Sequence, residues 1–523
     1  MPRIRPALAV LCGLYLAATL YRAATRPFWY DELFTFHLVK LGSLEKIQQA
    51  VAAGLDLNPP LLYLGTGLAQ VLFGAGELGT RMPAVAGFLV LIVCVYSFLA
   101  RRLPEDYALL AAGLVAVSGA CEYSYEARSY GMVLGWTGLA MVAWQRRRAL
   151  PLSLAVAGAL LSHCYALLLL PPLLAGQFVR SLSERRAEAR LWAALLAGSS
   201  AALAYLPLVR QAYAARLAGP IFDPSPLRLL GTYLDLAVPA LPAVVLSLAA
   251  IAATGRLDAA GLRHRLAWLG DRIPPAERVL LAVLLCAPVM AFVLAAAGRG
   301  GYFTRYGLGA AVAGASLFAI LCALLAGGDW KGARWLPWIT IGWFAAQFVW
   351  QARLPAQAPA ASPTIQAWLR RADEFLVVAD GQTFFELNHY LDRTAASRLV
   401  FLRDRESALR YMRTDCYDSP MPLLGRWFGM PGKVVEARDF LSRHRRFLLY
   451  GLSRPEHQWI LTRMKEESAT VRILADEPRR RLVEVVQSAA EGDASGSPEN
   501  GLKSVPESYT STPSARFSAF TTR

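Results

Sequence analysis

Two adjacent carboxylates, Asp31 and Glu32, directly follow the first apolar segment of the chain and are preceded by Tyr30. Carboxylates that are partly removed from water suit general-base chemistry. A charged side chain at the centre of a bilayer costs about 2.5 to 3.5 kcal/mol on insertion scales, so charges at the ends of apolar segments usually face water or one another. Charged residues at equivalent positions are therefore candidates for the same site.

Three further polar groups occupy such positions, at residues 122–130, 162–165 and 299–306. If the intervening apolar segments cross a membrane in alternation, all of these groups and Asp31 fall on one side. The position of any single one of these charged residues could be explained by a solvated loop or by an arginine that snorkels to the membrane surface. Opposite charges in separate loops on one side favour a shared site.

The elements that must position these residues are predicted to be membrane helices. The chain has 523 residues, of which 55% are hydrophobic and 18% charged, and its mean hydropathy is +0.36. Apolar runs close to the roughly 20 residues that span a bilayer recur as far as residue 351, and lipid-exposed backbone must be helical. We expect about eleven spans, near residues 7–21, 83–101, 106–120, 130–144, 150–162, 165–180, 191–207, 230–254, 279–297, 306–326 and 335–351.

Basic residues cluster in alternate loops, which predicts that the N-terminus is inside and that Asp31 and Glu32 lie outside. The same clustering explains the net charge of +16 without nucleic acid, for which no long basic face is present. Between the first two spans, residues 43–73 are predicted to form juxtamembrane helices, since Ser43 suits an N-cap and Pro59-Pro60 can only begin a helix. Residues 1–354 thus form a transmembrane domain.

A change in composition marks a second domain. Short buried strands alternate with helices after residue 363, near residues 375–379, 399–402, 447–450 and 471–474. We predict that residues 355–487 form a small extracytoplasmic α/β domain with a largely parallel sheet. Residues 488–523 are rich in Ser, Pro, Gly and Glu, which is typical of a disordered tail.

The order and spacing of several motifs resemble those of membrane glycosyltransferases of the GT-C superfamily. The closest similarity is to bacterial family 39-like members, related to protein O-mannosyltransferases and the lipid A aminoarabinose transferase. The motifs are Asp31-Glu32, the segment 58–63 with its Pro-Pro, Phe73-Gly74 leading to Arg81-Met82-Pro83, residues 127–130, and Arg305-Tyr306. The resemblance covers about residues 7–326.

The resemblance implies transfer of a sugar from a polyprenyl-phosphate-linked donor to an envelope acceptor, which could be a lipid, a polysaccharide or a protein. It places the catalytic carboxylate at Asp31, with Glu32 as a supporting group. Arg128 and Arg305 suit the donor phosphate, because a guanidinium binds phosphate oxygens through a planar fork. Direct transfer with one base implies inversion at the anomeric carbon. The expected location is the outer face of the bacterial cytoplasmic (inner) membrane.

Other residues near the four groups are candidates for substrate binding: Tyr30, Asp56, Asn58, Tyr130, His163 and Tyr306. The tyrosines also fit interfacial anchoring, and His163 also fits a satisfied interfacial histidine. Where some relatives carry an acidic–basic pair or His before Pro-Pro, this chain has Leu57-Asn58. We expect no required cofactor. Asp56 and His163 are weak candidates for a divalent metal, because two ligands without a characteristic spacing do not define a site.

Two functions of other classes are also compatible with the sequence. A membrane transporter or flippase of a lipid-linked saccharide would have internal repeats, paired broken helices and charges near the bilayer midplane. A non-catalytic assembly or sensory protein would use the external domain to bind a partner. The partners expected for the enzyme are the lipid-linked donor, the acceptor and membrane lipid.

Overall fold

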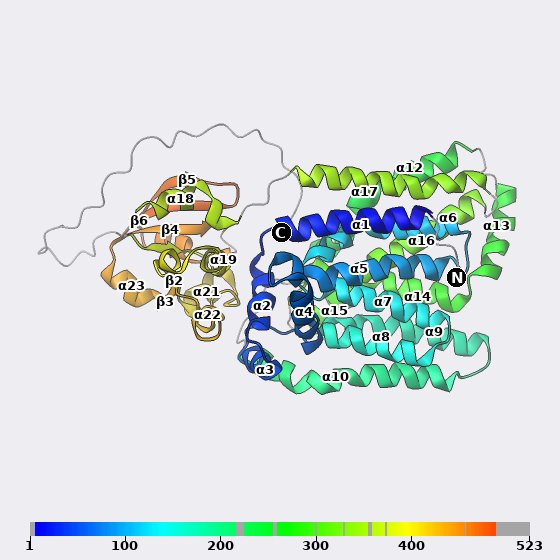
Figure 1. The fold of residues 1–523 in the computed structure, drawn as a ribbon, viewed down its shortest axis with the longest axis horizontal. Helices are drawn as coiled ribbons and strands as arrows, with labels where there is room; N and C mark the ends of the chain where they lie inside the picture. The colour runs from blue at the N-terminus through cyan, green and yellow to red at the C-terminus, as the bar shows by residue number, and fades with distance from the viewer. Residues whose placement is uncertain are drawn as a thin grey trace, which may run out of the picture. The chain divides into compact units, whose positions relative to one another are not determined.

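The computed structural model describes residues 6–215, 224–254, 259–298, 301–327, 330–353, 358–371, 374–454 and 457–487 (Figure 1). The chain divides into two compact units. One comprises Met1–Ala358 with Arg426–Gly429, and the other comprises Pro359–Gly425 with Met430–Arg523. The predicted disordered tail at 488–523 lies outside the described residues, as does Arg299.

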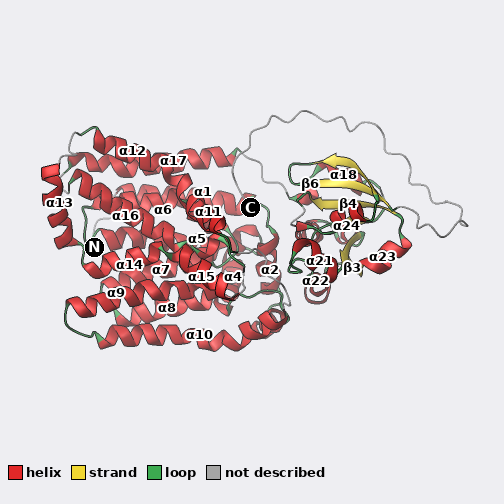
Figure 2. Cartoon of the chain, turned by 180° about the vertical axis from the view of Figure 1, so that it is seen from behind, coloured by secondary structure: helices red, strands yellow, loops and turns green. Residues whose placement is uncertain are grey.

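The first unit is helical, as predicted for the membrane domain. Figures 1 and 2 show its long helices running side by side, with α2, α3 and α4 together at one end of the bundle and α13 at the other. The α-helices are α1 (Pro6–Thr25), α2 (Tyr30–Val39), α3 (Leu44–Ala52), α4 (Pro60–Phe73), α5 (Glu77–Leu99), α6 (Glu105–Val117), α7 (Tyr130–Gln145), α8 (Ala149–Ser162), α9 (Leu170–Ser183), α10 (Ala189–Ala215), α11 (Pro226–Ala237), α12 (Leu241–Ala252), α13 (Ala259–Arg272), α14 (Pro275–Leu285), α15 (Ala287–Gly298), α16 (Gly309–Ala326) and α17 (Leu336–Ala352). Short 3₁₀ helices connect them: η1 (Gly119–Tyr125), η2 (Cys164–Leu169), η3 (Val238–Ala240), η4 (Thr304–Tyr306) and η5 (Lys331–Trp335).

Each segment predicted to span the membrane falls on one of these helices or on a consecutive pair. Within the described residues, six helical segments are long and apolar enough to cross a bilayer, and up to eight if each of two bent pairs is one span. The chain is thus a multi-pass membrane protein, whereas the expected number of eleven is not confirmed. The difference arises from helices such as α7 and α8, which have 16 and 14 residues and are shorter than a full crossing.

The predicted juxtamembrane helices correspond to α3 and α4. The Ser43 hydroxyl accepts a hydrogen bond from the backbone N–H of Lys46 and so caps α3, and Pro60 begins α4. Two helices were missed. The helix α13 lies between the predicted spans 230–254 and 279–297, where we expected a loop. We also expected a loop at Asp31-Glu32, but both residues lie in the first turn of α2. Acidic residues in a first turn are a helix signal, which the surrounding aromatic residues obscured.

The second unit contains one six-stranded sheet with strand order β3-β2-β1-β4-β6-β5, drawn in yellow in Figure 2. Pairings among β3, β2, β1 and β4 are parallel, and β6 pairs antiparallel with β4 and β5. The strands are β1 (Leu376–Val378), β2 (Leu399–Arg403), β3 (Lys433–Glu436), β4 (Arg446–Leu452), β5 (Thr470–Asp476) and β6 (Arg480–Val486). The helices are η6 (Pro359–Ala361), α18 (Pro363–Leu369), α19 (Gly381–Tyr390), α20 (Arg393–Ala396), α21 (Arg405–Met412), α22 (Met421–Phe428), α23 (Ala437–Arg443) and α24 (Ile460–Glu466).

The small α/β domain was therefore predicted correctly as a class, and four of its strands were located. The strands β3 and β6 were missed, because β3 is a short edge strand and β6 begins with Arg480-Arg481, which masks its apolar alternation. Three polar residues that follow β1 have structural partners. Asp380 caps α19 and accepts from the N–H of Leu452, Glu386 pairs with Arg480, and Asn388 accepts from the N–H of Gly432.

In the first unit, α5 and α7 approach closely through glycines. A Cβ atom on Gly131 would lie 2.4 Å from the carbonyl oxygen of Ala84, and one on Gly135 would lie 2.5 Å from that of Gly87. Such distances leave no room for a side chain, because the neighbouring atoms belong to the backbone of the facing helix. This contact fixes α7, whose first residue Tyr130 reaches the site described below.

We predict that Gly131→Ala lowers the melting temperature of the purified protein, because α5 and α7 must separate, with a cost of about 1 to 3 kcal/mol. Gly342→Ala is the matched control, since Gly342 also lies within a helix and an added Cβ there would meet no atom within 4 Å. Both substitutions gain the same helix propensity. Equal melting temperatures of the two variants would contradict the close contact.

Candidate functional site

A buried ion pair fixes the start of α2. Both side chains of Glu32 and Arg81 are fully buried, and Arg81 donates from Nε and Nη2 to the two carboxylate oxygens of Glu32, each at 2.7 Å. The backbone N–H groups of Ala127 and Trp29 also donate to Glu32, at 2.7 and 3.2 Å. Burial raises the pKa of Glu32, but Arg81 and these hydrogen bonds outweigh burial and lower it overall.

Arg81 completes the anchor through backbone carbonyls at the end of α1. It donates to Ala23, Arg26 and Pro27 at distances between 2.5 and 3.0 Å. The pair therefore joins the ends of α1, α2 and α5 to the segment before α7. Glu32 is fully buried and both of its oxygens are engaged, so it positions the site and has no free group for catalysis.

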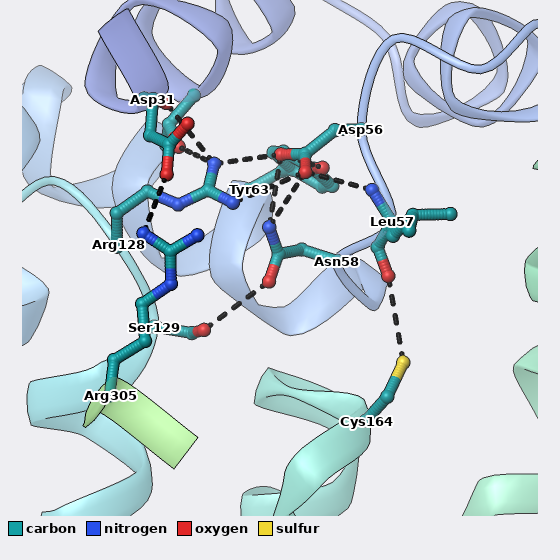
Figure 3. Close-up of polar contacts among 10 residues, drawn as sticks. Asp31, Asp56, Leu57, Asn58, Tyr63, Arg128, Ser129, Cys164 and Arg305 are labelled. Atoms are coloured by element: carbon teal, nitrogen blue, oxygen red, sulfur yellow. Dashed lines mark hydrogen bonds and ion pairs between the residues drawn. The ribbon is translucent and has the colours of Figure 1, made fainter. Parts of the chain in front are cut away.

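Asp31 precedes Glu32 by one residue and thus points about 100° away around the helix. Its carboxylate Oδ2 lies 3.0 Å from Nη1 of Arg305, and both side chains are about one-fifth exposed, at 19% and 18%. Figure 3 shows Asp31 next to the guanidinium groups of both Arg305 and Arg128. Arg128 donates to the backbone carbonyl of Asp31 at 3.1 Å and contacts the Thr35 hydroxyl at 3.3 Å.

Asp56 lies on the other side of Arg128 and is saturated with hydrogen bonds (Figure 3). Arg128 donates to its two oxygens at 3.0 and 3.3 Å. Asn58, Tyr63 and the N–H of Leu57 donate to it at 2.8 to 3.0 Å. Asp56 is only 4% exposed. It therefore serves as the fixed counter-ion of Arg128.

A pocket extends from Arg305 into the bundle. Its polar end contains Tyr130, His163, Tyr165, Arg305 and Tyr306, and Thr137 lies two helical turns beyond Tyr130. Two turns of α7 correspond to about 10 Å. The remaining lining is apolar and is supplied by Val133, Leu134, Ala166, Leu168, Leu169, Leu284, Ala287, Leu308 and Gly309. A cation at the polar end and aliphatic walls beyond it suit an amphiphile with an anionic head.

Aromatic rings form the polar end of this pocket. Tyr165 and Tyr306 stack with centroids 3.7 Å apart, and His163 lies 5.4 Å from Tyr130 and 5.9 Å from Tyr306. Burial and the charges of Arg128 and Arg305 lower the pKa of His163 to about 3, so it is neutral at pH 7. Its Nδ1 accepts from the backbone N–H of Tyr165, which leaves Nε2 as the protonated nitrogen.

Arg305 retains unused donor capacity. Burial would lower its pKa, but Tyr130 and Asp31 raise it well above the ordinary value, so it stays charged. Its Nε–H is buried and has no hydrogen-bond partner within the part of the chain that the structure describes. Arg128 differs, because most of its guanidinium is committed to Asp56, Thr35 and Asp31, although its Nε–H is likewise without a partner there.

The structure thus brings most of the candidate residues together. Asp31, Arg128, Arg305, Asp56 and Asn58 form one polar network. Tyr130, His163 and Tyr306 line the adjoining pocket. Tyr30 is buried against Phe34 and does not line the pocket.

Several residues of this site were missed: Thr35, Tyr63, Arg81, Ser129 and Tyr165. Arg81 is part of the motif Arg81-Met82-Pro83 that supported the family resemblance, but no role was assigned to it. A charge at the start of an apolar segment was the signal that this side chain needs a buried counter-ion. The partners of the weak metal candidates are also clear. The carboxylate oxygens of Asp56 accept hydrogen bonds from Tyr63 and Arg128. No group of three or more His, Cys, Asp or Glu side chains suited to a metal ion occurs among the described residues.

We predict that Glu32→Gln lowers the stability of the protein by about 3 to 5 kcal/mol, because it leaves Arg81 buried without its counter-ion. Since the folded-state pKa of Glu32 is lowered, the contribution of the pair is full above the ordinary glutamate pKa and is lost as pH falls through the folded value. The measurement is thermal unfolding in detergent. Glu45→Gln, an exposed carboxylate on α3, is the control. A Glu32→Gln variant as stable as the control would refute this role.

Comparisons with known proteins give a likeness in fold only. No protein-family model matches the sequence, and no characterised protein matches it by sequence. Among solved structures, ArnT from Cupriavidus metallidurans in the apo state is similar at 13% identity and a TM-score of 0.44, covering 91% of this chain and 97% of that one. The same protein bound to undecaprenyl phosphate is similar at 12% identity and a TM-score of 0.42, with the same coverage. These values are too low to carry an activity from ArnT to this chain.

Proposed function

We propose that this protein is a membrane glycosyltransferase that moves a sugar from a polyprenyl-phosphate-linked donor to an acceptor hydroxyl. The observation that carries the proposal is the pocket in which Arg305 lies 3.0 Å from the Asp31 carboxylate and is followed by aliphatic walls. A lipid phosphate matches this order of groups, with its phosphate at Arg305 and its prenyl chain between α7, η2 and α14 to α16. The sequence motifs favour the same class.

The reaction needs one base and one site for the leaving group. Asp31 takes the proton of the acceptor hydroxyl as the acceptor oxygen bonds to the anomeric carbon. The bond from that carbon to the phosphate oxygen breaks, and its electron pair leaves with the phosphate. Arg305 stabilises this charge through the N–H groups of its guanidinium.

The neighbouring carboxylates are engaged by other side chains, which favours direct displacement with inversion. Retention requires a second carboxylate as nucleophile. Asp56 is held by Arg128, Asn58 and Tyr63, and Glu32 is held by Arg81, so neither has a free oxygen to attack a sugar. Arg128 supports the base, because it holds the backbone of Asp31 and adds positive charge behind the phosphate position. We place the reaction at the outer face of the cytoplasmic membrane, with an envelope lipid, polysaccharide or protein as acceptor.

The central test replaces the base. Asp31→Asn should reduce transfer by roughly 100-fold or more, since general-base catalysis contributes factors of that size. The assay follows transfer from lipid-linked sugars in membranes containing the full chain, with Glu45→Gln as the control for expression and charge. Undiminished transfer by Asp31→Asn would remove Asp31 from the mechanism.

The donor and the product are found by mass spectrometry of lipid-linked sugars and envelope glycans. A strain without the protein and one with Asp31→Asn should both accumulate the same lipid-linked sugar and lack the same modification. A transporter or flippase would give another result: translocation of the lipid-linked sugar would depend on the protein, and no glycosidic bond would depend on Asp31.

We predict that a chelator leaves transfer intact, because Arg305 supplies the positive charge that a metal would otherwise provide. The measurement compares initial rates with and without EDTA. A large loss that one divalent ion restores would contradict this prediction and would require Asp56 or His163 to be reconsidered as ligands.

A further inference from the structure

Asp31 and Arg305 are each other's charged partner, and Arg305 lines the polar end of the pocket. Their separation is 3.0 Å, and among the described residues no other side chain forms an ion pair with either of them. The proposed reaction, on which this inference rests, asks two things of the pair at once. Asp31 must be free to accept a proton, and Arg305 must be free to hold a phosphate.

These demands conflict in the unliganded protein. While Oδ2 of Asp31 accepts a hydrogen bond from Arg305, that oxygen is not available to an acceptor hydroxyl. A guanidinium that is bound to a carboxylate offers fewer N–H groups to another anion. In the unliganded site, the ion pair therefore keeps both Asp31 and Arg305 from their roles in the reaction.

We propose that the donor phosphate displaces the Asp31 carboxylate from Arg305, so that donor binding itself unmasks the base. The phosphate replaces one anion by another at Arg305 and so frees the Asp31 oxygen that the guanidinium held. The base therefore becomes available only when a donor is in place. The donor consequently binds before the acceptor is deprotonated.

The surrounding contacts allow this exchange with little movement. The backbone of Asp31 is held by Arg128, which is fixed in turn by Asp56. The next residue, Glu32, is anchored to Arg81. Only the Asp31 side chain has to rotate away, and Arg305 already lines the pocket with a buried Nε–H that lacks a partner in the described chain.

The same competition assists product release. A prenyl monophosphate carries about −1.5 to −2 charges near neutral pH, so it would bind a lone Arg305 tightly. Once Asp31 has passed its proton to water, its carboxylate can reclaim Arg305 and compete with the product. Asp31 is thus base and competitor at one cation.

The test measures binding of undecaprenyl phosphate to the full-length protein in nanodiscs, with the corresponding polyprenol, which lacks the phosphate, as the ligand control. Competition predicts that Asp31→Asn binds undecaprenyl phosphate roughly tenfold more tightly than wild type, although it transfers sugar far more slowly. Asp31→Ala is the second variant. Glu45→Gln, which removes an exposed carboxylate on α3, should bind like wild type, and polyprenol binding should be the same in all proteins.

A double-mutant cycle assigns the effect to Arg305. In an Arg305→Ala background, Asp31→Asn should raise the affinity for undecaprenyl phosphate much less than in wild type, because no guanidinium remains for which the carboxylate and the phosphate compete. Equal or weaker binding by folded Asp31→Asn, while wild type binds the phosphate, would overturn the displacement and leave the proposed function standing. If wild type shows no preference for the phosphate over the polyprenol, the proposed function fails together with this inference.

Discussion

The fully buried pair of Glu32 and Arg81 is the interaction on which the site depends. Burying a single charge without a counter-ion is strongly unfavourable, so neither residue can turn away from the other. Arg81 also binds carbonyls at the end of α1, and Glu32 binds the N–H of Ala127. Through this pair, elements far apart in the sequence converge at one end of the bundle. Because Glu32 faces inward, Asp31 is turned towards Arg305.

The polar network divides its charges between fixed and available groups. Asp56 and Arg128 are joined through two oxygens and are surrounded by further donors, which makes them a rigid support. Asp31 and Arg305 share one contact and are partly exposed. A rigid pair beside a loosely held pair is an arrangement suited to binding and proton transfer, since the second pair can exchange partners while the first keeps its geometry.

The helical membrane unit and the α/β class of the second unit could be predicted because hydrophobic run length and strand–helix alternation are local properties of the sequence. The pairing of Asp31 with Arg305, 274 positions apart, depends on how the helices pack. The sequence could predict only that both residues lie on the same side of the membrane. Glu32 shows the limit of such reasoning. Its residue type and its neighbours suit catalysis, but its carboxylate is bound by Arg81. Arg81 lies at the start of another helix, so the sequence pattern did not connect the two residues. The strand β6 was missed for a local reason, since Arg480-Arg481 at its start masks its apolar alternation.

Arg305 is proposed to receive the phosphate of a prenyl lipid beside Asp31, and the mechanism rests on this contact. Its most direct test is a cryo-electron microscopy structure of the full chain with undecaprenyl phosphate. We predict the phosphate within hydrogen-bonding distance of the Arg305 guanidinium, the Asp31 carboxylate turned away from it, and the prenyl chain along Leu134 and Leu169. A phosphate bound elsewhere, with Asp31 still paired to Arg305, would contradict this mechanism.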